Sequence, residues 1–192
     1  MVYFRKHYKG DAILIKSKAD YKLYIAADLK SSTANISKWK WHYNITKPIL
    51  RCQRLLRKVE YYGNCRKDLF GRIIYYWLTY RFKTQSIKLG ITITPNVFDK
   101  GLRIAHYGSV IVNKSARIGK NFVVHSGVNI GVSKGGAPHI GDNVYVGPGA
   151  ILYGGIKIGN NVKIGANSVV NKDVPANVTV AGVPAKIISR ND

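Results

Sequence analysis

Acidic side chains, cysteines and long apolar runs are all scarce in this chain of 192 residues. It has 9 Asp and Glu, among which Glu60 is the only glutamate, and 2 Cys. No apolar run approaches the roughly 20 residues that a membrane-spanning helix needs, and the first residues lack the apolar stretch of a signal peptide. Two cysteines in a chain with a large core need no disulfide. We therefore expect a globular, cytoplasmic protein.

The shortage of acids leaves a strongly basic chain. Against 9 acidic residues stand 31 Lys and Arg, a formal net charge of +22. Residues 1–100 carry 21 basic and 6 acidic side chains, a net of +15, whereas residues 101–192 carry 10 and 3, a net of +7. Such a field attracts polyanions. An anionic membrane surface is one partner that would fit it, and a merely solvated basic surface is the alternative. We expect no nucleic-acid binding, because the sequence holds no recognisable nucleic-acid motif.

What the sequence does contain is a repeat of six residues. Between residues 112 and 175 an aliphatic residue opens each hexad, glycine is the commonest second residue, and a small or β-branched residue often fills the fifth place. A period this short predicts a solenoid built from one repeated unit, because neither a helix nor simple strand alternation has a period of six. The opening positions are Val112, Ile118, Val124, Ile130, Ile140, Val146, Leu152, Ile158, Ile164 and Val170.

These hexads predict a parallel β-helix, in which three hexads make one triangular coil and each coil climbs by one strand spacing of roughly 4.8 Å. The opening aliphatic side chains should point inward and stack. Corners should fall at residues 141–143, 159–161 and 165–167, where Gly and Asn tolerate positive φ. Ile130 and Ile140 are ten residues apart, so four extra residues should leave the prism within residues 133–138.

The first half of the chain predicts helices instead. Residues 20–28 look helical, and Pro48 suits the first position of a helix that ends near Gly63. A wide aromatic stripe in the following helix consists of Leu69, Ile73, Tyr76 and Tyr80. We interpret it as core packing, with sugar stacking or contact with a lipid interface as the alternatives. We therefore expect a mainly β protein with two parts, an α-helical region over residues 1–90 and a β-helix with a C-terminal cap over residues 91–192.

Function in a regular β-helix must come from side chains that break its pattern. His106 lies in an irregular stretch between Ile104 and Val112, and His125 takes the second place of a hexad, where glycine is usual. Counting through the repeat puts Val124 one coil beyond Ile104, so the two imidazoles should lie close together. Such a pair can act as a base and its partner or as metal ligands. We expect no metal, because the histidine spacings of 19 and 14 residues, from His106 to His139, do not suit a three-histidine zinc site.

At these residues the sequence resembles a known family. The segment Gly101-Leu-Arg-Ile-Ala-His106-Tyr-Gly resembles the catalytic histidine segment of the hexapeptide-repeat acyltransferases, in the branch around serine acetyltransferase and its glycan O-acetyltransferase relatives. Residues 164–175 and 180–186 resemble the terminal coil and cap of that group, and residues 54–62 resemble the N-terminal helices of the polysaccharide branch. The resemblance spans roughly residues 20–188 and is most specific from about residue 90 onward.

The resemblance implies a left-handed β-helix, against the usual right-handed crossover, and a homotrimer with acetyl-CoA lying between neighbouring prisms. His106 would be the general base, because a neutral imidazole can take a hydroxyl proton at cellular pH. The hydroxyl oxygen would attack the thioester carbonyl directly, while a backbone N–H holds the oxyanion. His125 is the second catalytic candidate. The residues expected to contact coenzyme A are Gly131, Ala166, Ser168, Lys172 and Lys186.

Departures from the family pattern bear on the acceptor. Serine acetyltransferases carry an Asp immediately before the catalytic His, where this chain has Ala105. A second Asp aligns with Thr92, and an Arg-His pair that holds the amino acid aligns with Gly136 and Ala137. We therefore predict transfer of acetyl to a sugar hydroxyl in capsule, exopolysaccharide or O-antigen assembly, on a saccharide that can be lipid-linked at the inner membrane. Serine O-acetylation for cysteine biosynthesis and a non-catalytic β-helix scaffold are the alternatives. The residues that would orient His106 are His125, Asn96, Asp99 or Glu60.

Overall fold

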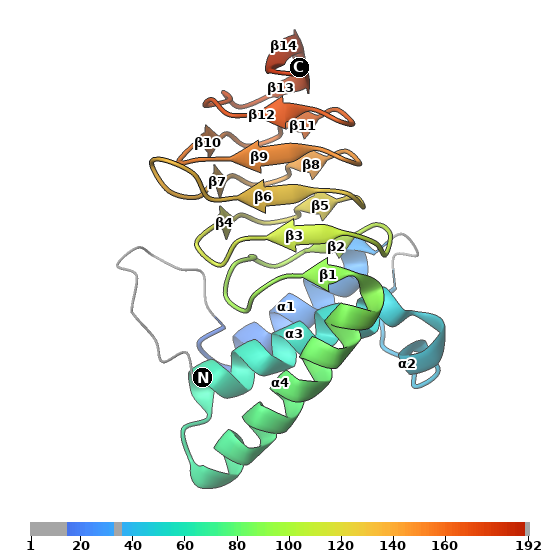
Figure 1. Cartoon of the computed structure of the whole chain (residues 1–192). Coiled ribbons are helices and arrows are strands. Elements are labelled where there is room, and N and C mark those ends of the chain that lie inside the picture. The colour runs from blue at the N-terminus through green and yellow to red at the C-terminus, as the bar shows by residue number, and fades with distance from the viewer. Residues whose placement is uncertain (1–14, 33–35, 191–192) are drawn as a thin grey trace.

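The hexads wind into a solenoid of triangular coils, and the helices lie against its N-terminal end (Figure 1). This computed structural model describes residues 15–32 and 36–190. Its helices are α1 (Lys18–Ser31), α2 (Tyr43–Thr46), α3 (Pro48–Cys65) and α4 (Leu69–Leu89). The predicted fold class, a mainly β chain with a parallel β-helix after a helical region, is confirmed.

Three sheets form the walls of the prism. The first contains β1 (Ile91–Thr92), β3 (Val110–Val112), β6 (Asn129–Gly131), β9 (Ile151–Tyr153) and β12 (Val169–Val170). The second contains β4 (Arg117–Ile118), β7 (His139–Ile140) and β10 (Lys157–Ile158). The third contains β2 (Arg103–Ile104), β5 (Val123–Val124), β8 (Tyr145–Val146), β11 (Lys163–Ile164), β13 (Val178–Gly182) and β14 (Ala185–Arg190). Pairing is parallel throughout the coils, and only the β13–β14 hairpin at the C-terminal end is antiparallel among the described strands.

The inside of the prism is the apolar core that the hexads predict. Each of the ten opening residues is buried, from Val112 to Val170, and so are fifth-place residues such as Ala116, Val144 and Val162. Successive coils place equivalent residues in register, as Ile104, Val124, Val146 and Ile164 pair in turn along the third sheet. One column of buried aliphatic side chains therefore runs up each wall, as predicted.

The corners differ in one respect from the prediction. Asn143, Asn161 and Asn167 adopt left-handed backbone, with φ of 57°, 58° and 54°. The glycines of the same corners do not; a side chain at Gly141, for example, would collide with Asn160 on the next coil. Asparagine therefore supplies the turn, because its short polar side chain tolerates this conformation, and glycine supplies the close approach between coils.

The extra residues between Ile130 and Ile140 leave the prism as a loop. Ser133 and Gly136 close it through two backbone hydrogen bonds, of 3.1 Å and 3.0 Å. The loop projects from the wall between β6 and β7, where Figure 1 shows it standing clear of the coils. The position predicted from the spacing is therefore correct.

The helices have the termini that their sequences favour. Pro48 occupies the first turn of α3. The Asp68 side chain caps α4 by accepting a hydrogen bond of 2.8 Å from the Gly71 N–H, and Gly90, with φ of 70°, ends that helix in left-handed backbone. Strand β1 begins at the next residue, so α4 leads directly into the first coil.

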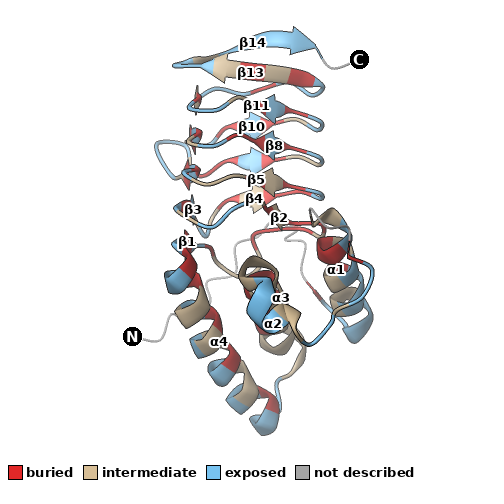
Figure 2. Cartoon of the chain, turned by 90° about the vertical axis from the view of Figure 1, so that its right-hand side faces the viewer, coloured by how far each residue is buried: buried red, intermediate tan, exposed pale blue. Residues whose placement is uncertain are grey.

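We predicted that the aromatic stripe of α4 packs in the core, and this prediction is wrong. Leu69, Ile73, Tyr76 and Tyr80 are 76%, 58%, 55% and 70% exposed. The opposite face of α4, with Leu78 and Phe82, packs against α3 instead. Figure 2 shows this alternation of buried and exposed faces along the helix. The prediction failed because α4 is apolar on two opposite faces, and periodicity alone does not say which of them is inward.

Buried side chains of the helices and of the solenoid form one continuous cluster. It runs from Cys52 and Leu56 on α3 through Leu89 and Ile91 into the coils. Burial raises the pKa of the Cys52 thiol to about 11, although the Ser86 hydroxyl opposes the shift, so this cysteine is a core residue. The division into two domains at residue 90 stays a prediction.

Candidate active site

His106 and His125 follow β2 and β5 at the same edge of the prism. The register pairs Ile104 with Val124, and the Ala105 N–H donates to the Val124 carbonyl over 2.9 Å. The two imidazole rings lie on adjacent coils with their centroids 5.6 Å apart and their planes inclined by 47°. The proximity expected from counting hexads is therefore present.

The two histidines have different surroundings. His106 is exposed, whereas His125 is half-buried and its ring lies 5.2 Å from that of Tyr145 on the next coil. Burial lowers the pKa of His125, and the nearby His106 and Arg103 lower it further because they would repel an imidazolium. In the part of the chain that is described, neither imidazole has a side-chain hydrogen bond. His106 is therefore free to bind a hydroxyl, beside a His125 that favours its neutral form.

The other residues expected to orient His106 make their polar contacts elsewhere. Glu60 accepts from the Asn96 N–H over 2.7 Å and from Arg57 over 3.0 Å. The Asn96 amide pairs with Asn64, and the Asp99 carboxylate accepts from the Lys100 N–H. Among the described residues no polar contact joins Glu60, Asn96 or Asp99 to His106, so the structure does not support any of these three as the residue that orients it.

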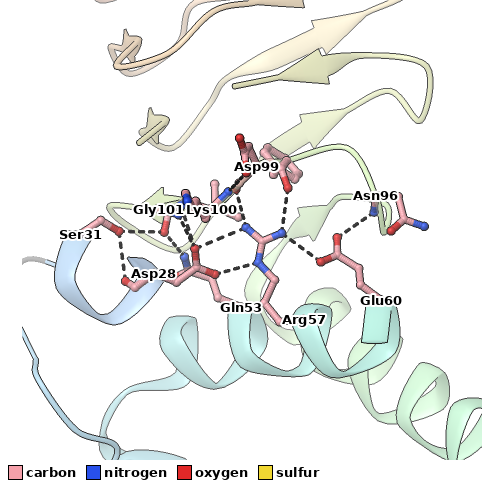
Figure 3. A network of polar contacts seen from close by, with 11 residues as sticks. Asp28, Ser31, Gln53, Arg57, Glu60, Asn96, Asp99, Lys100 and Gly101 are labelled. Atoms are coloured by element: carbon pink, nitrogen blue, oxygen red, sulfur yellow. Dashed lines mark hydrogen bonds and ion pairs between the residues drawn. The ribbon is translucent and has the colours of Figure 1, made fainter. Parts of the chain in front are cut away.

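These residues belong instead to a buried network that holds the first coil on the helices (Figure 3). Its centre is Arg57 on α3, which is fully buried. The guanidinium donates to Asp28 on α1, to Glu60, and to the backbone carbonyls of Phe98 and Asp99, over 2.8, 3.0, 2.9 and 2.7 Å. Although burial lowers the pKa of Arg57, the two carboxylates outweigh it and raise that pKa above its ordinary value.

Asp28 extends the network to the residues immediately before β2. Its Oδ1 accepts from the N–H groups of Gly101 and Leu102, over 2.8 Å and 2.9 Å. The Leu102 carbonyl in turn accepts from Ser31 and from Gln53. Since His106 lies four residues beyond Leu102, α1 and α3 fix the start of the segment that carries the candidate base.

The residues expected to bind coenzyme A are spread over two edges and the cap. Ala166 and Ser168 lie at the edge of the two histidines, on a later coil, whereas Gly131 ends β6 and Lys172 follows β12 at the next edge. Lys186 lies in β14. Ser168 is fully buried and its hydroxyl accepts from the Gly182 N–H over 3.3 Å, which favours a structural role. The coenzyme contacts of the other four remain predictions.

Comparison with known proteins identifies this architecture. The sequence model described as bacterial transferase hexapeptide (six repeats) matches residues 137–172. The solved structure of soybean serine acetyltransferase complexed with serine superposes with a TM-score of 0.69 at 30% identity, covering 89% of this chain and 70% of that one. The chain belongs to the hexapeptide-repeat transferases.

Two further relatives of this hexapeptide-repeat transferase bear on its chemistry. Serine acetyltransferase of Mycobacterium tuberculosis is 38% identical over 110 residues, which is 55% of this chain and 48% of the relative. Serine acetyltransferase of Brucella abortus in complex with coenzyme A gives a TM-score of 0.66 at 25% identity, over 91% of this chain and 70% of that chain. The chain thus spans about half the length of the curated relatives it matches.

Sequence reasoning missed two residues beside the histidines. Arg103, Val123, Tyr145 and Lys163 occupy one outward-facing column of the third sheet, in register. Writing the hexads as columns would have shown Tyr145 one coil beyond His125, and Arg103 at the foot of the column. The transferase therefore places a cation and an aromatic ring around its histidine pair.

Proposed function

We propose that this protein is an acetyl-CoA-dependent O-acetyltransferase with His106 as the general base. The observation that carries the proposal is the exposed His106 ring, whose centroid lies 5.6 Å from that of His125 at the edge of a hexapeptide-repeat solenoid. The relatives named above are acetyltransferases, and one of them was solved with coenzyme A. The pairing gives the base a neutral neighbour, since burial and adjacent positive charge lower the pKa of His125.

The reaction needs no covalent intermediate on the enzyme. His106 takes the proton of the acceptor hydroxyl as its oxygen attacks the thioester carbonyl carbon of acetyl-CoA. A backbone N–H stabilises the tetrahedral oxyanion. The carbon–sulfur bond then breaks, and the imidazolium returns its proton to the leaving thiolate. The products are an O-acetyl ester and free coenzyme A.

L-Serine is the acceptor that the relatives favour. The proteins most similar to this chain include serine acetyltransferases, one of them solved with serine bound. This order reverses the ranking reached from the sequence, which put a sugar hydroxyl first. In serine acetyltransferases this acetylation belongs to cysteine biosynthesis, which would then be the role of this chain.

A sugar hydroxyl is the second candidate, and a specific observation supports it. Ala105, Gly136 and Ala137 stand where serine acetyltransferases carry an Asp and an Arg-His pair. None of the three has a side chain that can hydrogen bond. No carboxylate of the described residues contacts His106 either. A saccharide acceptor, free or lipid-linked, would not need those charged groups. The scaffold alternative predicts neither candidate reaction and fails if acetyl transfer is observed.

A homotrimer would complete the coenzyme site. Ala166 and the histidines lie at one edge of the prism, whereas Gly131 and Lys172 lie at the next, so neighbouring chains could bring the two edges together around acetyl-CoA. The outward column of the first sheet also holds two isoleucines, Ile111 and Ile151, which are 40% and 42% exposed and lie on either side of Asn129. Sedimentation equilibrium tests this part: a trimer is expected, and a monomer at micromolar concentration would contradict it.

The exposed face of α4 fits an anionic membrane surface. Alongside the stripe, Phe70, Trp77 and Ile87 are 67%, 54% and 79% exposed. Tyr and Trp favour the membrane interface, and the helix carries four basic and no acidic residues over 69–89. Two copies of α4 would repel each other, whereas anionic lipid would attract both. No helix in the described parts of the chain meets the length and apolarity needed to cross a membrane.

Vesicle sedimentation tests the membrane contact. The protein should sediment with vesicles that contain phosphatidylserine at low salt and should be released at high salt. Trp77→Ser should weaken this binding, whereas Trp41→Ser, which changes a 77% exposed tryptophan outside α4, should not. Equal binding to neutral vesicles would contradict the proposal. If Trp77→Ser changes only the oligomeric state, another copy of the chain covers the stripe instead.

Release of coenzyme A from acetyl-CoA tests the function itself. L-Serine is supplied in one reaction, and de-O-acetylated envelope polysaccharide of the source organism, with its lipid-linked repeat units, in the other. Turnover with serine supports the first acceptor and turnover with the glycan the second. Turnover with neither, in a protein that also fails to bind acetyl-CoA, would overturn the proposal.

A further inference from the structure

A cavity of about 340 Å³ opens beside the segment that carries His106. Its walls come from the start of α3, from Ser32 after α1, and from β2 with the residues that follow it. Ala105 and Tyr107, the two neighbours of His106 in the chain, both line it. The volume is within the range of small-molecule sites, roughly 300–1,000 Å³. His106 itself does not line the cavity, so the part of an acceptor that carries the reacting hydroxyl must extend out of the cavity to reach the imidazole.

The lining is electropositive. Lys47 and Arg103 are among the lining residues, and none of those residues is an Asp or a Glu. Most of the remaining wall is apolar, with Pro48, Ile49 and Leu50 from α3. An apolar cavity with a few convergent polar groups is typical of ligand sites, and here the charged groups are both cations.

Arg103 has polar capacity that the folded chain does not use. Its Nε is buried and has no hydrogen-bond partner, and its guanidinium makes no ion pair with a carboxylate among the residues described. A buried donor left unsatisfied is destabilising, so native proteins seldom retain one without a function. The Nε of Arg54 is also unpaired, but the Arg54 guanidinium lies 4.5 Å from the centroid of the Trp39 ring. Arg103 has no such contact.

The position of Arg103 connects the cavity to the histidines. It precedes His106 by three residues and pairs through β2 with Val123, two residues before His125. Its charge reaches His125, since after burial and His106 it is the third cause that lowers the pKa of that imidazole. A ligand anion on Arg103 would thus lie near His125 and on the same coil as His106.

We propose that this cavity binds the acceptor, and that Arg103 holds an anionic group of the acceptor, a carboxylate or a phosphate, while His106 activates its hydroxyl. A guanidinium suits both groups because it binds carboxylate and phosphate through paired N–H donors. The inference rests on the proposed O-acetyltransferase function and narrows it. Serine would fit through its carboxylate and a sugar phosphate through its phosphate, whereas an uncharged glycan would leave Arg103 unpaired.

Acceptor kinetics with Arg103→Met test the inference. L-Serine, glucose 1-phosphate and methyl glucoside serve as carboxylate, phosphate and uncharged probes. For the anionic probe that reacts, Arg103→Met should raise KM at least tenfold and leave the KM for acetyl-CoA within twofold. Lys163→Met is the matched control, because Lys163 lies in the same column three coils away and does not line the cavity; it should change neither. Arg103→Lys should recover part of the loss. An unchanged acceptor KM in Arg103→Met, or preference for methyl glucoside, overturns the proposal.

Calorimetric binding separates this inference from the proposed function. Serine or glucose 1-phosphate should bind the wild type and a His106→Ala variant alike, and should bind Arg103→Met at least tenfold more weakly. If that pattern holds without any turnover, the anion site stands and the proposed reaction is wrong. If turnover occurs but Arg103→Met binds and reacts normally, the reaction stands and the site is wrong. Lack of saturable binding of both anionic probes to the wild type also rejects the site. Circular dichroism confirms that each variant is folded.

Discussion

Replacing Arg57 with leucine should destabilise the whole protein, because one guanidinium compensates two buried carboxylates. The Arg57 side chain is 0% exposed, and those of Asp28 and Glu60 are 6% and 2% exposed. Arg57→Leu would remove the only cation that pairs with both carboxylates among the described residues, together with the hydrogen bonds to the carbonyls of Phe98 and Asp99. Removing one partner of a buried ion pair costs about 3–5 kcal/mol. In a chain of this length 1 kcal/mol shifts Tm by about 2–4 °C, so we expect a fall of about 6–20 °C.

The stability that Arg57→Leu loses relative to wild type should depend on pH, because the variant leaves ionisable carboxyl groups buried. Burial already raises the pKa of Glu60 against the opposing charge of Arg57, and without Arg57 that pKa should rise further. A carboxyl whose folded pKa exceeds its unfolded value is stabilising while protonated, and loses that contribution as the pH rises through the folded pKa. The variant should therefore lose less stability relative to wild type at about pH 5 than at about pH 7.

Thermal unfolding followed by circular dichroism measures both effects. The matched control is Arg66→Leu, because Arg66 also pairs with an aspartate, Asp68, over 2.9 Å, but with side chains 41% and 48% exposed. A solvent-exposed ion pair contributes little to stability, so this variant should unfold within a few degrees of wild type. If Arg57→Leu unfolds no earlier than Arg66→Leu, the network does not hold the first coil on the helices as described.

Two other predictions concern the solenoid. Arg103→Met should raise the pKa of His125, followed by NMR titration, because it removes a positive charge that disfavours the imidazolium; an unchanged pKa would place Arg103 too far away to matter. Asn143→Ala should lower the free energy of unfolding in urea by about 1–3 kcal/mol. It removes two side-chain hydrogen bonds of 2.9 Å, to Asn121 and Asn161, and places alanine in strained backbone at φ of 57°. Asn143→Gly, which keeps the turn unstrained, should lose less, and equal losses would refute the strain component.

The local periodicity of the sequence predicts the solenoid well because each hexad contacts its own repeats. Buried positions such as Val124 and Ile140, the loop after Ile130 and the approach of His106 to His125 all follow from counting residues. Long-range features do not. The apolar stripe of α4 has the pattern of a core face, but α3 packs on the opposite face of the helix. The hydrogen-bond partners of Arg57 are separated from it in sequence by up to 42 residues. The cavity at Arg103 is likewise made by α3 and β2, which only the fold brings together.

The most direct test of the central claim is acetyl transfer by His106→Ala. Loss of a general base typically costs about 100- to 10,000-fold in rate, so release of coenzyme A with the reactive acceptor should fall by at least about 100-fold. His139→Ala, which changes an exposed histidine on β7, should retain full activity. A folded His106→Ala variant with near wild-type turnover would show that His106 is not the base and would contradict the account at its centre.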